Sequence, residues 1–175
     1  STRVRSSAAS DVYKRQHSAG AVWAVHLAAS LEGAARNRLS GLLLLDPVST
    51  GPAFEADLRR AASTRTNGQA PAVRALLADP GRCNAWGNAR APLEALRESQ
   101  PVGRASLERL PDSTHLDAEA EASDWLAVQA CGQGAPRPDV IEATRQWVLR
   151  WAREMAQSAE APQDRPTGTS TGLPR

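Results

Sequence analysis

The sequence has few of the residues that mark several common classes of protein. Two cysteines among 175 residues are too few for a disulfide-dense scaffold. No apolar run approaches the roughly 18 residues that a membrane-spanning helix needs, so we expect no membrane span. The formal net charge is only +2, from 21 basic and 19 acidic residues. This near-balance gives no broad field for a nucleic acid or an anionic membrane.

Motifs for cofactors and metals are also missing. A phosphate-binding loop needs a lysine, and the single lysine of the chain, Lys14, is not part of one. The close glycines Gly132 and Gly134 do not open a helix after a strand, as a dinucleotide-binding motif would. The H-x-D-x-E stretch that begins at His115 supplies too few ligands for a metal. We therefore expect no cofactor and no metal.

Residue usage changes near residue 16. The only lysine and the only tyrosine, Lys14 and Tyr13, precede this point, and the rest of the chain is rich in alanine and uses arginine. The stretch SSAASDVYKRQ resembles a translated sequencing adapter, so we interpret residues 1–16 as a foreign or disordered segment. Residues 17–157 form the predicted domain, and residues 158–175 a disordered tail. A cytoplasmic and a secreted location both stay open, as does the oligomeric state.

Between these ends, helix patterns alternate with strand patterns. Short apolar runs closed by proline predict a strand buried on both faces over residues 39–48, which is also compatible with a helix, and a second strand over residues 72–79. An alternating pattern predicts a third strand over residues 102–110. Alanine-rich or periodic stretches predict helices over residues 21–35, 54–62, 89–98 and 139–156. Asp139 and Glu142 fit a capping box at the start of the last helix. The alternation predicts a three-layer α/β fold with a mainly parallel sheet.

Ser18 is the candidate nucleophile. It stands in the stretch HSAG before a predicted helix, similar to the Gly-x-Ser-x-Gly turn that presents a serine between strand and helix. Gln16 replaces the first glycine of that motif, next to the change in residue usage. The amide of Ala19 would bind a developing oxyanion at the helix N-terminus. Because S-x-G is common, an ordinary helix-capping serine is the alternative.

Acyl transfer by serine also needs a base and an acid that orients this base. Of the three histidines, His115 lies on a polar loop after the third predicted strand, where a general base belongs. His17 adjoins the serine and would point elsewhere, and His26 is expected to be a packed or surface residue. Asp46 ends the first predicted strand. The order Ser18, Asp46, His115 is that of the α/β-hydrolases.

These stretches resemble the C-terminal half of an α/β-hydrolase, and within that fold the chlorophyllase-like and platelet-activating-factor-acetylhydrolase-like esterases. The resemblance covers residues 17–156 and rests on HSAGA, LLLLDPV, CNAWGN and STHLDAE. It implies a serine esterase with a triad of Ser18, Asp46 and His115 and a small-molecule ester as substrate. Chlorophyllases carry arginine where Ala19 stands here, so chlorophyll is not the expected substrate.

Some residues keep a second interpretation. Many α/β-hydrolases place the acid one strand later, where Asp79 stands, although the D-P-V context favours Asp46. Asp117 and Glu119 are expected to start a helix that runs through Trp125, since negative charge is favourable there.

The two cysteines and the tryptophans have predicted structural roles. Cys83 and Cys131 are expected to pair, because both follow elements at the active edge, with two buried thiols as the alternative. The five tryptophans are expected in the core and in pocket walls.

In the resembling fold a central strand precedes the nucleophile, and here VYKRQ does not read as a buried strand. The leucine-rich strand would then have an unpaired apolar edge. We therefore expect a poorly stable or aggregation-prone chain with impaired activity. Two alternatives to the esterase stay open, namely a non-catalytic α/β binding module and a non-functional truncated fragment.

Overall fold

The computed structural model describes residues 13–17, 19–63, 70–118, 125–132 and 134–160, with side chains from residue 20 to residue 157. Its sheet has four strands in chain order, all parallel to their neighbours. The strands are β1 (Tyr13–His17), β2 (Gly41–Leu45), β3 (Ala72–Leu77) and β4 (Ala105–Arg109).

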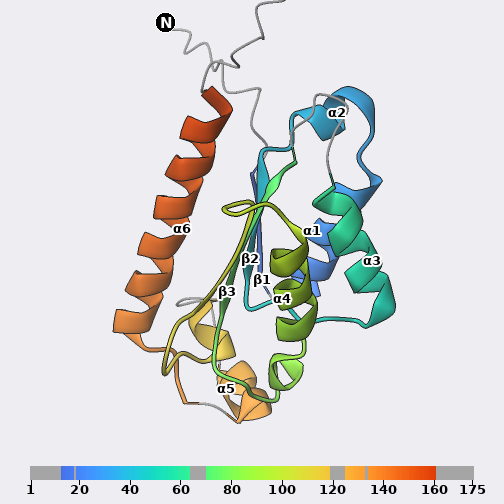
Figure 1. Cartoon of the computed structure of the whole chain (residues 1–175). Coiled ribbons are helices and arrows are strands. Elements are labelled where there is room, and N and C mark those ends of the chain that lie inside the picture. The colour runs from blue at the N-terminus through green and yellow to red at the C-terminus, as the bar shows by residue number, and fades with distance from the viewer. Residues whose placement is uncertain (1–12, 18, 64–69, 119–124, 133, 161–175) are drawn as a thin grey trace, which may run out of the picture.

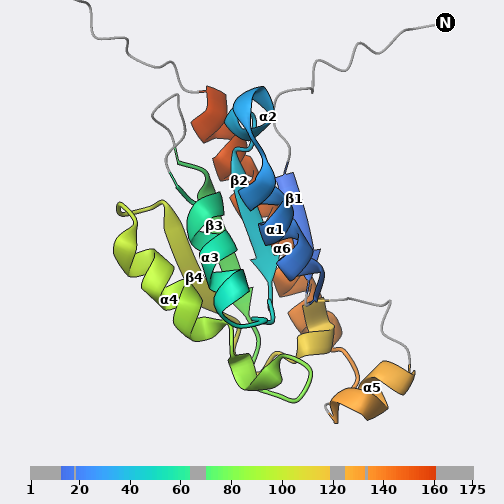
Figure 2. The same ribbon diagram turned by 90° about the vertical axis from the view of Figure 1, so that its right-hand side faces the viewer.

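Helices cover both faces of this sheet, which gives three layers (Figure 1). They are α1 (Ala19–Ser30), α2 (Gly33–Asn37), α3 (Pro52–Ala61), α4 (Arg90–Ser99), α5 (Trp125–Cys131) and α6 (Pro138–Glu160), with short 3-10 helices η1 (Ala85–Gly87) and η2 (His115–Ala118). Figure 2 shows α1, α3 and α4 side by side on one face with α6 behind the sheet. The α/β class is therefore confirmed. No helix in the described part of the chain is long and apolar enough to cross a bilayer.

The larger core lies between the sheet and the helices α1, α3 and α4. Alternate strand residues point into it, among them Leu42 and Leu44 of β2 and Val73 of β3, which are at most 1% exposed. Phe54 and Leu58 of α3 pack against the same face. Because all five residues of β2 are buried, this strand is covered on both faces, as its run of leucines predicted.

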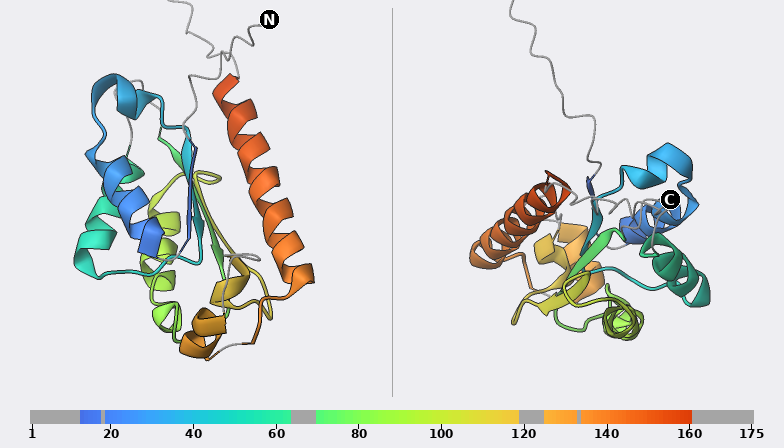
Figure 3. Two further views of the ribbon diagram at one scale, coloured as in Figure 1. Left: turned by 180° about the vertical axis from the view of Figure 1, so that it is seen from behind. Right: turned by 45° about the horizontal axis from the view of Figure 1, so that its top comes forward.

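A smaller core lies between the opposite face and α6 (Figure 3). Leu43 and Leu45 of β2 contact this helix through Trp147 and Met155. A Cβ added to Gly41 would lie 2.3 Å from the Met155 sulfur and 2.7 Å from a backbone oxygen. The glycine at the start of β2 therefore lets α6 lie directly on the strand.

The three strands predicted from apolar runs are confirmed, and two of the predicted helices differ in detail. The helix predicted over residues 21–35 is divided, because Glu32 is extended and Gly33 has a φ of 51°. The predicted capping box at Asp139 is wrong. The last helix begins at Pro138, whose fixed φ suits the first helical position, and Glu142 instead accepts a hydrogen bond from Gln146.

The structure corrects the prediction at both ends of the chain. The sequence predicts no strand among the first residues, but Tyr13–His17 forms β1 and pairs with Gly41–Leu45. Backbone pairing does not require apolar side chains, and polar residues are common on edge strands. The foreign origin of residues 1–16 stays a prediction. The last helix continues to Glu160, and the rest of the predicted disordered tail lies outside the described residues.

The tryptophans are divided between core and surface. Trp147 is buried and Trp151 is half-buried. Trp23, Trp86 and Trp125 are each at least 70% exposed, so their prediction as core residues is wrong. Residue type alone does not reveal which indole lies on the outer face of its helix or turn.

Candidate active site

Asp46 is the first residue after β2, at the carboxyl edge of the sheet where parallel α/β proteins place their chemistry. It has a φ of 41°, a left-handed conformation that aspartate tolerates better than most residues. Its amide nevertheless donates to the Leu76 carbonyl of the neighbouring strand at 2.7 Å. This sharp turn directs the carboxylate across the end of β3 rather than along the strand.

The Asp46 carboxylate is 3% exposed and accepts three hydrogen bonds. Oδ1 accepts from the Ala78 amide at 3.0 Å, and Oδ2 accepts from the Asn84 amide at 3.0 Å. Oδ2 also lies 2.5 Å from Nδ1 of His115. A buried carboxylate needs such partners, because loss of water is otherwise very costly.

His115 begins η2, in the loop that follows β4, and is 3% exposed. When the Asp46 carboxylate is ionised it can only accept, so Nδ1 is then the donor in this contact. In the neutral imidazole with its proton on Nδ1, Nε2 has the lone pair that a general base uses. The structure thus brings together the predicted acid and the predicted base from positions 69 residues apart.

Asp117 lies in η2 and binds two backbone amides that fix this short helix. It is 2% exposed, and its carboxylate accepts from the Thr114 amide at 2.5 Å and from the Arg137 amide at 2.7 Å. The structure places Asp117 in η2 and gives α5 from Trp125 onward, but residues 119–124 lie outside the described residues, so the expected helix start at Asp117 stays a prediction. Glu119 lies outside the described residues.

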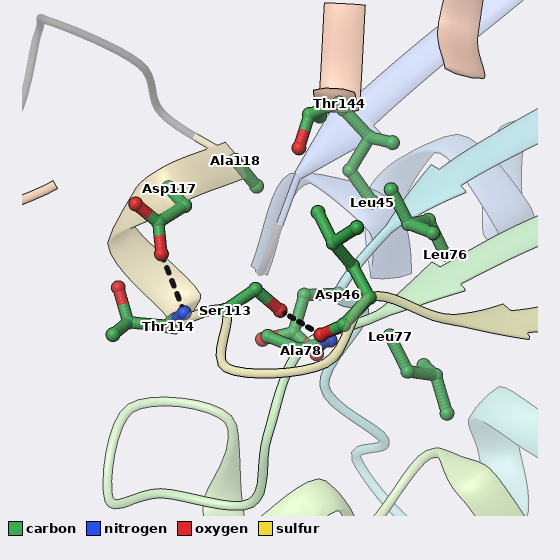
Figure 4. A pocket seen from close by; sticks show the side chains of 11 residues that line it. Leu45, Asp46, Leu76, Leu77, Ala78, Ser113, Thr114, Asp117, Ala118 and Thr144 are labelled. Carbon is green, nitrogen blue, oxygen red and sulfur yellow. Dashed lines mark hydrogen bonds between the residues drawn. The ribbon is translucent and has the colours of Figure 1, made fainter. Parts of the chain in front are cut away.

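A small cavity lies between the end of the sheet and η2 (Figure 4). Asp46, Asp117 and Thr144 are among the residues that line it, together with leucines from β2 and β3. The dashed line from Thr114 to Asp117 in Figure 4 shows the hydrogen bond that closes the loop on one side. This cavity lies next to η2, and we interpret it as a gap in side-chain packing.

The competing acid, Asp79, has a different partner. Its Oδ1 accepts two hydrogen bonds from Arg109, at 2.8 and 3.0 Å, and its side chain is one-third exposed. His26, which the sequence predicted to be a packed or surface residue, is exposed on α1 and lies 2.8 Å from Asp57 of α3. Neither contact involves His115.

Ser18 lies outside the described residues. The strand β1 ends at His17 and the helix α1 begins at Ala19, so Ser18 stands in the sequence between a strand and a helix, as the nucleophile does in the motif. Ala19 is the first residue of α1, and its first turn contains no acidic side chain. Its amide therefore belongs to the electropositive first turn of the helix, whose first amides have no partner within the helix itself.

Two contacts at the carboxyl edge of the sheet involve the loop after β3. Cys83 and Cys131 form a disulfide, as predicted. Asn84, next to the first cysteine, is fully buried and binds the Asp46 carboxylate, a role that sequence reasoning missed. In the sequence, Asn84 stands out only as a member of the CNAWGN stretch, one of those that resemble the α/β-hydrolases. Among the described residues, no cluster of histidine, cysteine and acidic side chains could hold a metal.

Comparisons of the chain with models of protein families, with curated proteins and with solved structures found no match. What the chain does is therefore inferred from its own residues and their geometry.

Proposed function

We propose that this chain is part of an α/β-hydrolase that cleaves carboxylic esters through a serine nucleophile. Ser18 is the proposed nucleophile, His115 the base and Asp46 the acid that orients the base. The observation that carries this proposal is the buried contact of 2.5 Å between Asp46 and Nδ1 of His115 at the carboxyl edge of a parallel sheet. A buried, orienting carboxylate on one ring nitrogen is what a catalytic histidine needs.

In the first half of the proposed reaction, Nε2 of His115 takes the proton from the Ser18 hydroxyl as its oxygen attacks the ester carbonyl. The carbonyl oxygen becomes an oxyanion, to which the Ala19 amide donates a hydrogen bond. Asp46 stabilises the imidazolium that forms. The tetrahedral intermediate then collapses, the bond to the alcohol oxygen breaks, and His115 returns the proton to the leaving alcohol.

In the second half, His115 takes a proton from water, and the resulting nucleophile attacks the acyl-serine. Collapse of this second intermediate releases the carboxylic acid, and the proton returns from His115 to Ser18. In the resembling fold an earlier loop provides a second oxyanion donor. Removal of one oxyanion donor slows such a reaction by on the order of 10²–10³ in rate.

Covalent labelling by a fluorophosphonate tests the proposal directly. We expect labelling of the wild-type chain at Ser18, no labelling of Ser18→Ala, and strongly slowed labelling of His115→Ala, because an unactivated serine is a weak nucleophile. Ser30→Ala is the matched control, since the Ser30 hydroxyl binds only the Leu27 carbonyl at the end of the same helix. Tryptic mass spectrometry identifies the modified residue.

The alternative of a non-catalytic binding module predicts a different outcome. A folded wild-type chain, shown by circular dichroism, that neither labels nor releases p-nitrophenol from short-chain esters would contradict the esterase. Equal labelling of wild type and Ser18→Ala would contradict the assignment of the nucleophile.

A further inference from the structure

Asn84 has an unusual environment for an amide side chain. It is 0% exposed, and its side chain takes part in four hydrogen bonds. Oδ1 accepts from the amides of Gly81 and Gly87, at 2.8 and 3.0 Å. Nδ2 donates to Oδ2 of Asp46 at 3.0 Å and to the Asp79 carbonyl at 2.9 Å. The oxygen therefore binds the backbone of the loop, whereas the nitrogen binds both this backbone and the Asp46 carboxylate.

The oxygen end shapes the loop after β3. By accepting two backbone amides, it closes the turn that contains η1, where Ala85 and Trp86 both have positive φ. Such backbone conformations persist only where surrounding contacts fix them. The disulfide of the preceding residue, Cys83, ties this turn to the end of α5. The Asn84 backbone is therefore held independently of Asp46.

The nitrogen end acts on the candidate acid. Oδ2 of Asp46 receives both the Asn84 amide and Nδ1 of His115, whereas Oδ1 receives the Ala78 amide. Rotation of the carboxylate would break all three contacts at once. The Ala78 amide directly follows β3, and the Asn84 side chain is held by the loop backbone, so these two donors fix the plane of the carboxylate independently of the imidazole.

We infer that Asn84 is a positioning residue, whose side-chain amide fixes the Asp46 carboxylate so that Oδ2 faces Nδ1 of His115. The effect of this contact on catalysis rests on the proposed esterase function, whereas the orientation of the Asp46 carboxylate does not. An asparagine suits this position because one side chain supplies acceptors to the loop and a donor to the acid. A misaligned acid would leave the imidazole in several orientations, and a misplacement of about 1 Å can cost roughly 10² in rate.

Asn84→Asp changes only the nitrogen end of the side chain. The new carboxylate keeps an acceptor for the Gly81 and Gly87 amides, but it directs an acceptor instead of a donor at Asp46 and at the Asp79 carbonyl. Asn88→Asp is the matched control, because it adds the same charge four residues on. The Asn88 side chain is exposed and exchanges hydrogen bonds with the Ser49 backbone, at 2.8 and 2.9 Å, rather than with Asp46.

The first measurement is the nuclear magnetic resonance signal of the His115 Nδ1 proton, assigned by its loss in His115→Gln. It requires neither ester nor nucleophile. We expect a hydrogen-bonded proton in the wild type and in Asn88→Asp, and its loss or a clear shift in Asn84→Asp. The second measurement is ester turnover, for which we expect kcat to fall roughly 10²-fold in Asn84→Asp with KM little changed.

Each outcome bears on the inference. An unchanged proton signal and rate in Asn84→Asp, or equal changes in the two aspartate variants, would overturn it. If Asn84→Asp loses its cooperative melt, the same proton is measured in Asn84→Ser, which adds no charge, and an unchanged signal there would overturn the inference. If the proton responds as expected but the wild type neither labels nor turns over esters, Asn84 still positions the acid and the proposed esterase function fails.

Discussion

At the scale of single residues, Asp117 joins two segments that the site depends on. One carboxylate oxygen accepts the Thr114 amide, just before His115, and the other accepts the Arg137 amide, just before α6. Since the side chain is 2% exposed, no water can easily replace it. The candidate base is thus anchored to α6, which lies on the other face of the sheet from α1, α3 and α4.

We predict that Asp117→Ala destabilises the chain strongly. The change leaves two backbone amides without their acceptor, and each such loss costs about 1–3 kcal/mol. Urea unfolding followed by circular dichroism measures the free energy of unfolding. Asp139→Ala is the control, because Asp139 pairs with Arg137 at the surface and its loss should matter little. Equal effects of the two substitutions would show that Asp117 is not an anchor.

At the scale of single residues, the sequence predicts only part of the candidate site. The candidate acid was predictable, because an aspartate directly after a buried run of leucines lies at the active edge of a parallel sheet. The buried contact of Asn84 with Asp46 was not predictable. It depends on a turn with two consecutive positive φ values at Ala85 and Trp86, neither of which is glycine. Sequence patterns give no sign of such a conformation when the residues that adopt it are not the usual ones.

At the scale of elements, the disulfide connects the loop after β3 with α5. Cys83 and Cys131 are separated by 48 residues, and the loop between them includes α4, β4 and η2. A cross-link of this length removes much conformational freedom from the unfolded chain. It also holds both sides of the site, because Asn84 follows the first cysteine and α5 contacts η2.

We predict that reduction of this disulfide lowers the free energy of unfolding by roughly 2–4 kcal/mol. The measurement is urea unfolding with and without a phosphine reductant. In Cys83→Ser/Cys131→Ser, the reductant should have no effect, and this variant should match the reduced wild type. A reductant effect that persists in the double variant would mean that the disulfide is not its cause.

Elements were predicted best where burial decides them. The strands β2 and β3 follow apolar runs and are largely buried, and β4 follows an alternating run. The break between α1 and α2 and the strand β1 were not predicted. The first depends on a single left-handed glycine, and the second on backbone pairing by a polar stretch whose side chains give no apolar pattern.

At the scale of the whole molecule, β1 protects the sheet. The strand β2 is buried along its entire length, and β1 pairs with all five of its residues, from Gly41 to Leu45. Without β1, a flat and fully apolar strand would have unpaired backbone groups along one side, which favours pairing between molecules. The sequence of β1 is polar, with Lys14 and Arg15 at its centre, as is typical of a strand that discourages such contacts.

We therefore predict that β1 is required for a soluble, cooperative fold, whatever the origin of residues 1–16. Deletion of residues 1–17 should abolish the sharp melt and give self-association in size-exclusion chromatography and light scattering, because the leucine strand becomes an open edge. Deletion of residues 1–12 is the matched control, since it leaves the Tyr13–His17 strand in place. This shorter deletion should melt like the full chain. If both deletions melt like the full chain, the pairing of β1 with β2 contributes nothing, and the sheet effectively begins at Gly41, as the sequence alone had suggested.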